Sequence, residues 1–106
     1  MAKYAFVGGI LVDGTGAAPV QDSLVLVDDD KITYAGPRTE VPAGYEVEDI
    51  SGKTIMPGLI DTHLHFSGNL TDDDNDWVIE SVAQKQACAV KQSYDCLTHG
   101  LTTVCD

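Results

Sequence analysis

The sequence has 106 residues, enough for one small domain with a modest core, and its 43% apolar content is that of a globular chain. The formal net charge of −11, from 17 acidic residues against 6 Lys and Arg, argues against a nucleic-acid partner, because binding phosphates needs a basic face. No apolar run reaches the roughly 18 residues of a membrane span, and the N-terminus does not have the pattern of a signal peptide. We therefore expect a soluble, cytoplasmic protein that does not bind membranes.

The first 56 residues predict short strands separated by turns. Strands are expected in the runs KYAFVGG, ILVDG, DSLVLVDD, KITYAG, YEVEDI and KTIMPG. Asp13-Gly14 is a strong turn signal, and the acidic run 28–30 is expected to turn the chain between two strands of a hairpin. Strands at intervals of about ten residues favour a small β-sandwich or a meander over residues 1–56.

The pattern changes at Pro57-Gly58. The run LIDTHLHF predicts another strand, a polar acidic loop follows, and apolar residues at helical spacing predict a helix over residues 77–98. Asp76 is the expected N-cap and Gly100 the expected C-terminal stop. The run LTTVCD predicts a final strand, so residues 57–106 form a βαβ unit with parallel strands.

The expected fold class is therefore mixed α/β, with a change of architecture in the middle of the chain. A single βαβ unit leaves sheet edges and apolar faces unpaired. Three cysteines, Cys88, Cys96 and Cys105, form an odd set without a pairing pattern and are expected to be free thiols. Cys105 is expected to be buried and structural.

The histidines of the run PGLIDTHLH carry the clearest chemical signal. On a strand, residues i and i+2 point to the same side, so His63 and His65 are expected to share one space, with Asp61 on the same face. Two neutral imidazoles can bind one divalent metal. The alternative is a pair of histidines hydrogen-bonded to their neighbours. His99, at the expected end of the helix, is interpreted as a capping residue.

The longer run GKTIMPGLIDTHLHF resembles the signature of the amidohydrolase superfamily, whose members are metal-dependent hydrolases on a TIM barrel. In that family a β-sandwich precedes the first barrel strand, and the segment P-G-L/F-I-D-x-H-x-H forms that strand and supplies two metal-ligating histidines. Every position of the segment is filled here, by Pro57, Gly58, Leu59, Ile60, Asp61, His63 and His65. The runs ILVDGTG, LVLVDDDKITYAGP and LTHGLTTVCD are similar to the flanking family segments, so the resemblance covers essentially the whole chain.

Within the superfamily, the DGTG opening and the GLTTVCD end are similar to the imidazolonepropionase-like and Xaa-Pro dipeptidase-like branch. Cys105 departs from the arginine that is usual in that branch, which puts any substrate-specific role of this position in doubt. The resemblance implies that His63 and His65 ligate a divalent metal, with zinc expected, and that Asp61 supports a ligand ring.

The resemblance also implies what the chain lacks. The family's bridging Lys or Glu, two later histidines and catalytic Asp come from barrel strands four, five, six and eight, whereas this sequence reaches strand two. Two imidazoles are too few for a catalytic site that needs three protein ligands and a water. We therefore assign no catalytic residue, and we expect the chain by itself to be inactive with an incomplete metal site.

Two functions remain open. The first is the N-terminal part of a metal-dependent amidohydrolase that hydrolyses C–N bonds of a small molecule, completed by the remainder of the barrel or by a second chain. The second is a catalytically inert fragment or subunit that associates with itself or with a partner chain. Both hypotheses predict an oligomer or complex.

Overall fold

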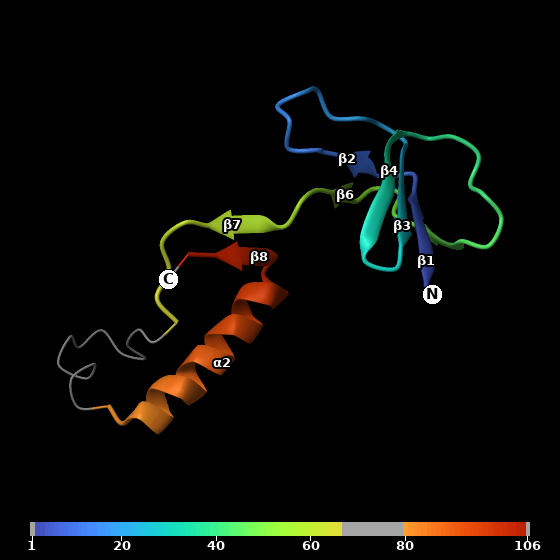
Figure 1. Ribbon diagram of the computed structural model, residues 1–106. Helices are drawn as coiled ribbons and strands as arrows, with labels where there is room; N and C mark the ends of the chain where they lie inside the picture. Colours follow the sequence, from blue (N-terminus) through green and yellow to red (C-terminus); the bar gives the residue numbers. More distant parts are fainter. Residues whose placement is uncertain (1, 67–79, 106) are drawn as a thin grey trace. The chain divides into compact units, whose positions relative to one another are not determined.

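The computed structural model describes residues 2–66 and 80–105. The chain divides into two compact units, Met1–Pro57 and Gly58–Asp106 (Figure 1). The first unit consists of strands, and the second combines two strands with one helix in its described part. No helix within the described ranges is both long and apolar enough to cross a membrane. The mixed α/β composition expected from the sequence is confirmed.

The first unit contains a four-stranded sheet in the order β4-β3-β1-β5. Its strands are β1 (Lys3–Val7), β3 (Ser23–Asp28), β4 (Lys31–Pro37) and β5 (Glu46–Asp49). The antiparallel pair β3–β4 confirms the expected hairpin, and Asp29 adopts a φ of 55° in its turn. A second sheet pairs β2 (Ile10–Leu11) with β6 (Thr54–Ile55) in parallel.

The expectation of a simple meander is wrong. A meander pairs consecutive strands antiparallel, whereas β1 pairs in parallel with β5, and β2 pairs in parallel with β6. Both partners lie some 40 residues away along the chain, and a register of that kind depends on contacts between distant side chains. Local alternation of apolar residues predicts where strands are and does not predict these partners.

The core of the first unit lies around the central strands. Ala5, Val7, Leu24 and Leu26 form its buried cluster, and Tyr34, Val41 and Tyr45 pack against it. Ser23, Leu24, Val25 and Leu26 are all buried, so β3 is covered on both faces. The buried Ser23 hydroxyl donates to the Gly9 carbonyl at 2.9 Å, so this polar group does not go unpaired in the core.

The second unit has β7 (Leu59–Asp61), α2 (Val82–Thr98) and β8 (Leu101–Val104), and the two strands pair in parallel as predicted. Gly58 is required at the start of this pairing, because a Cβ there would overlap the Thr102 side chain. The expected strand over residues 59–66 is too long, since β7 ends at Asp61 and leaves His63 and His65 in the segment that follows.

The helix begins at Val82, later than the apolar pattern indicated. Ser81 is its N-cap: the hydroxyl oxygen accepts from the Gln84 backbone N–H at 3.3 Å, and the Gln84 side chain accepts from the Ser81 N–H at 2.9 Å. This reciprocal capping box defines the first turn. Asp76, the expected N-cap, lies outside the described residues.

At the other end of α2, His99 is the C-cap, which confirms its expected role. Its Nδ1–H donates to the Asp95 carbonyl at 2.7 Å, and its backbone N–H also bonds carbonyls of the last turn. Gly100 follows with a φ of 88°, the left-handed conformation that ends helices. The chain is thereby turned directly into β8.

All three cysteines are free thiols, as expected. Cys88, on α2, is buried, whereas Cys105 is exposed, so the prediction of a buried Cys105 is wrong. The acidic run 28–30 does connect β3 to β4. Asp28 ends β3 and forms an ion pair with Lys3 at 2.7 Å, and the next two residues form the turn. The acidic run 72–76 lies outside the described residues.

Candidate metal site

The candidate site lies where the chain leaves the carboxyl end of β7. Two backbone hydrogen bonds hold this segment against the residue that follows β8: the Cys105 N–H donates to the Asp61 carbonyl at 2.9 Å, and the Leu64 N–H donates to the Cys105 carbonyl at 3.0 Å. The segment is therefore fixed by main-chain pairing beyond the end of the strand. Cys105 contributes its backbone to this pairing, while its own side chain is exposed.

Asp61 gives the segment its local turn. Its Oδ1 accepts a hydrogen bond from the backbone N–H of His63 at 3.0 Å, the arrangement of an Asx-turn. The carboxylate therefore acts on the main chain of His63. The predicted support of a ligand ring by Asp61 stays a prediction.

The two imidazoles converge although they do not lie on a strand. Their Nε2 atoms are 3.2 Å apart, and the rings meet edge to face with centroids 5.0 Å apart and an interplanar angle of 89°. Two nitrogens bound to one zinc ion at the usual 2.0–2.1 Å, at a tetrahedral angle, would be about 3.3 Å apart. The separation of the nitrogen atoms of His63 and His65 therefore fits a shared ion.

The pair does not make a complete site. Within residues 2–66 and 80–105, no cluster of three or more His, Cys, Asp or Glu side chains is placed to hold a metal. His99 cannot join the pair, because it precedes β8 whereas His63 and His65 follow β7, and these parallel strands place those positions at opposite ends. A catalytic zinc site needs three protein ligands, so further ligands are required.

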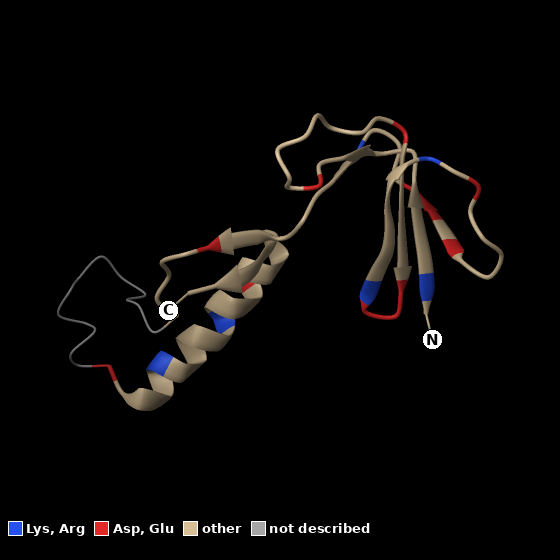
Figure 2. Cartoon of the chain, turned by 45° about the horizontal axis from the view of Figure 1, so that its top comes forward, with Lys and Arg blue, Asp and Glu red and all other residues tan. Residues whose placement is uncertain are grey.

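Among the residues that the structure describes, charged groups elsewhere do not form a second candidate site. Figure 2 shows acidic residues in the turn between β3 and β4 and along β5. Two hydrogen bonds from Ser51 hold the pKa of the Asp49 carboxyl below its usual value. The bond from the Ser51 hydroxyl has the larger effect and the bond from the Ser51 N–H the smaller one. The Thr15 N–H, followed by its hydroxyl, lowers the pKa of Asp13 in the same way. Both arrangements are exposed turns that stabilise an ionised carboxylate.

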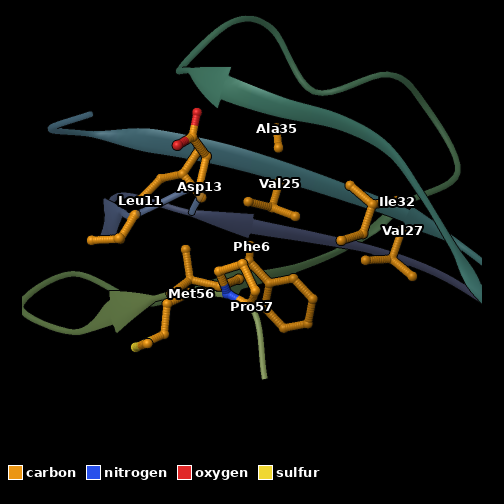
Figure 3. A pocket seen from close by; sticks show the side chains of 11 residues that line it. Phe6, Leu11, Asp13, Val25, Val27, Ile32, Ala35, Met56 and Pro57 are labelled. Atoms are coloured by element: carbon orange, nitrogen blue, oxygen red, sulfur yellow. The ribbon is translucent and has the colours of Figure 1, made fainter. Parts of the chain in front are cut away.

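A hollow of about 250 Å³ opens on the first unit (Figure 3). Its lining is apolar apart from Asp13, and comes from the residues Phe6, Leu11, Val12, Asp13, Val25, Val27, Ile32, Ala35, Ile55, Met56 and Pro57. A single carboxylate does not provide the nucleophile, acid and metal ligands that hydrolysis needs. The histidine pair therefore remains the candidate functional site.

Sequence reasoning missed one residue beside this pair. The side chain of Gln92, on α2, reaches the main chain directly after the second histidine. Gln92 lies four residues after Cys88 and four before Cys96, which places it on the same face of the helix as the buried Cys88, and this spacing is the signal in the sequence.

Comparison with known proteins identifies the family of the chain. The sequence model of the Amidohydrolase family matches residues 54–106, which is half of the chain and includes the histidine segment. The chain therefore belongs to the amidohydrolase family.

Curated relatives include the imidazolonepropionase of Hyphomonas neptunium, 43% identical over 67 residues, covering 55% of this chain and 16% of the relative. The 5-methylthioadenosine/S-adenosylhomocysteine deaminase of Symbiobacterium thermophilum is 32% identical over 124 aligned residues, covering 100% of this chain and 28% of the relative. The chain thus spans well under a third of the length of these curated relatives.

Solved structures extend the match to both units. An amidohydrolase crystal structure superposes with a TM-score of 0.82 at 28% identity, covering 97% of this chain and 25% of that one. An Xaa-Pro dipeptidase with bound methionine superposes with a TM-score of 0.81 at 23% identity, covering 97% of this chain and 26% of that one. The fold of this chain is that of the N-terminal quarter of these enzymes.

Proposed function

We propose that this chain is the N-terminal part of a metal-dependent amidohydrolase that hydrolyses amide, cyclic amide or dipeptide C–N bonds with a metal-activated water. Residues 1–56 are proposed to contribute a β-sandwich, and residues 57–106 the first strand, helix and second strand of a TIM barrel. The observation that carries this proposal is the 3.2 Å approach of the His63 and His65 Nε2 atoms within a complete P-G-L-I-D-x-H-x-H segment.

His63 and His65 would hold the metal, for which zinc is the expected identity, and Asp61 would keep the His63 backbone in place. The ion, when bound, acidifies a water to a pKa of about 7 and polarises the substrate carbonyl. Because parallel-barrel sites lie at the carboxyl ends of the strands, the position of the pair after β7 supports this role.

The substrate class rests on the named relatives. An imidazolonepropionase, a deaminase and an Xaa-Pro dipeptidase all carry names that refer to C–N bonds. We propose a small molecule with such a bond as the substrate. The remaining ligands and the acid–base group are proposed to come from the remainder of the barrel, in a longer form of this protein or in a second chain.

The test is reconstitution. The 106-residue chain is mixed with a chain supplying barrel strands three to eight of a related amidohydrolase, with zinc present, and hydrolysis of imidazolonepropionate and of Xaa-Pro dipeptides is measured. We expect activity in the mixture, sensitive to a chelator, and only weak sub-stoichiometric zinc binding by the chain alone. His63→Ala should abolish both the activity and the zinc binding, because one of two converging ligands is lost.

His99→Ala serves as the matched control, because this histidine caps α2 and lies at the opposite end of the parallel pair from the proposed ligands. It should keep the zinc binding and the activity of the mixture. Zinc binding that survives His63→Ala would show that the ligand assignment is wrong. Tight 1:1 zinc binding by the chain alone would show that its site is already complete.

A second candidate is a subunit without catalysis that acts by association. Its support is the set of large apolar side chains exposed on the second unit: Leu59, Ile60, Val82, Val90, Tyr94 and Leu97. Light scattering on the same samples separates the two functions. A stable oligomer of the lone chain, unaffected by a chelator and inactive in the mixture, would favour this second function.

A further inference from the structure

Gln92 connects the helix to the segment that carries the histidines. It lies in the second half of α2 and is half-buried. With its carboxamide nitrogen facing the segment, Gln92 donates to the carbonyl of Phe66 at 2.6 Å and to the carbonyl of His65 at 3.2 Å. One side chain thus bonds two successive carbonyls, one of which belongs to a proposed ligand.

The orientation of this carboxamide follows from its partners. Carbonyl oxygens only accept hydrogen bonds, and the amide nitrogen is the donor end of a glutamine side chain. The reverse orientation would place the amide oxygen against the two carbonyls of His65 and Phe66 and leave it without a donor. The two N–H groups of the amide match the two acceptors.

Gln92 bonds the segment immediately beyond the contacts made by Asp61 and Cys105. Ahead of both proposed ligands in the chain, the Asp61 carboxylate accepts a hydrogen bond from the His63 N–H. Between the two ligands, the Leu64 N–H donates to the Cys105 carbonyl. These bonds fix the chain up to Leu64. The contacts from Gln92 follow immediately, at His65 and Phe66, and they tie the second ligand to a rigid helix.

We propose that Gln92 is a positioning residue for the metal pair: its carboxamide fixes the backbone of His65 so that the two imidazole nitrogens stay at chelating distance. The inference rests on the proposed metal-binding function. Chelation by two side chains requires both nitrogens within a few tenths of an ångström of their positions, which loops achieve only when supporting hydrogen bonds hold them.

The experiment uses the full 106-residue chain, zinc ion alone as the probe, and the ring NMR signals of His63 and His65 as the readout. Gln92→Met keeps the length and the helix propensity of the side chain and removes both donors. We expect zinc affinity to fall about 10–100-fold, the range found for residues that orient metal ligands. Helix content, measured by circular dichroism, should stay unchanged.

Gln86→Met is the matched control, because Gln86 is exposed on the same helix. It should bind zinc as the unmodified chain does. Gln92→Glu is the second variant: it has the same shape, and its added negative charge would by itself draw zinc closer. Weaker zinc binding in this variant supports the loss of the donors as the cause, and stronger binding would overturn the proposal.

His63→Ala separates the two levels of the argument. If His63→Ala leaves zinc binding intact, the proposed metal function fails whatever Gln92 does. If His63→Ala abolishes binding and Gln92→Met binds zinc as tightly as the unmodified chain, the metal function stands and the role of Gln92 is wrong. Loss of helix content in both Gln92 variants would make it a packing residue and would also overturn the proposal.

Discussion

Seven of the eight buried apolar residues among the described residues lie in the first unit, and only Cys88 lies in the second. The first unit covers its central strand β3 on both faces, whereas α2 exposes Val82, Val90 and Tyr94 to about 70%. The sheet unit therefore draws its stability from burial. The βαβ unit depends on caps and main-chain hydrogen bonds, because it has little buried area of its own.

This difference in burial between the two units parallels the distribution of their candidate functional groups. The first unit has a packed core and a hollow in which Asp13 is the one charged lining residue, and a single carboxylate is not a catalytic set. The second unit holds the histidine pair and leaves several large apolar side chains exposed. Three predictions test the contrast, from the largest expected effect to the smallest.

The largest effect is expected from Leu24→Ala. Leu24 is fully buried in β3, and truncating such a side chain costs about 2–5 kcal/mol of unfolding free energy. Val90→Ala, at a position 72% exposed on α2, should cost less than about 0.5 kcal/mol. Amide hydrogen exchange during urea unfolding measures both losses of stability, when the protection of β1 and β3 is compared with that of α2. A comparable loss from Val90→Ala would break the contrast between the units.

A middle effect is expected from Ser81→Ala. The change removes the N-cap hydroxyl of a helix that buries little, and such losses cost about 1 kcal/mol. We expect a visible loss of helix content by circular dichroism with the β signals of the first unit unchanged. Gln86→Ala, on the same helix without a capping role, should not lower the helix content. Unchanged helicity in Ser81→Ala would show that contacts other than the cap hold the first turn.

The smallest effect on stability is expected from a change of pH that protonates the Asp49 carboxylate. Ser51 donates to Asp49 Oδ1 through its hydroxyl at 2.6 Å and its N–H at 2.8 Å, and these bonds hold the Asp49 pKa below its usual 3.8. A carboxyl with a lowered pKa stabilises the folded state above its unfolded pKa, and this contribution is lost as the pH falls through the folded pKa. The first unit should therefore lose some stability on acidification.

Ser51→Ala removes the hydroxyl donor, so it should lower the melting temperature of the first unit near pH 7 and have less effect at an acidic pH below 3.8, where the stability contributed by the lowered Asp49 pKa is being lost. Thermal unfolding at both pH values measures the difference. The corresponding Asp13–Thr15 turn is unchanged in this variant and serves as the internal reference. An equal loss at both pH values would show that the ionised carboxyl is not the cause.

His63 and His65 do share one space, but for a different reason than periodicity, and their role as metal ligands stays a prediction. Strand alternation predicted that His63 and His65 share one space, yet β7 ends at Asp61 and both histidines follow it. Their nitrogens converge because Asp61 turns the chain and Cys105 bonds the segment on both sides of His63. The Asp61 turn is local, whereas the Cys105 bonds are main-chain bonds to a residue some 40 positions away, which no local pattern encodes.

Other differences have similar causes. The Ser81-x-x-Gln84 capping box was readable in the sequence, but apolar spacing back to residue 77 favoured an earlier start. Cys105 was expected to be buried because free cysteines are commonly buried, but burial depends on what packs against the residue, and Cys105 is exposed. The carboxamide of Gln92 reaches its partners only once α2 lies beside the segment.

The sequence by itself determined the strands of the first unit, the βαβ pattern of the second, the P-G-L-I-D-x-H-x-H segment and its family, because each rests on local periodicity, turn chemistry or a contiguous motif. The tertiary structure alone decided the parallel pairing of β1 with β5, the end of β7 and the 3.2 Å approach of two imidazoles. Each of these depends on hydrogen bonds between residues distant in sequence, whose geometry exists only after the chain has folded.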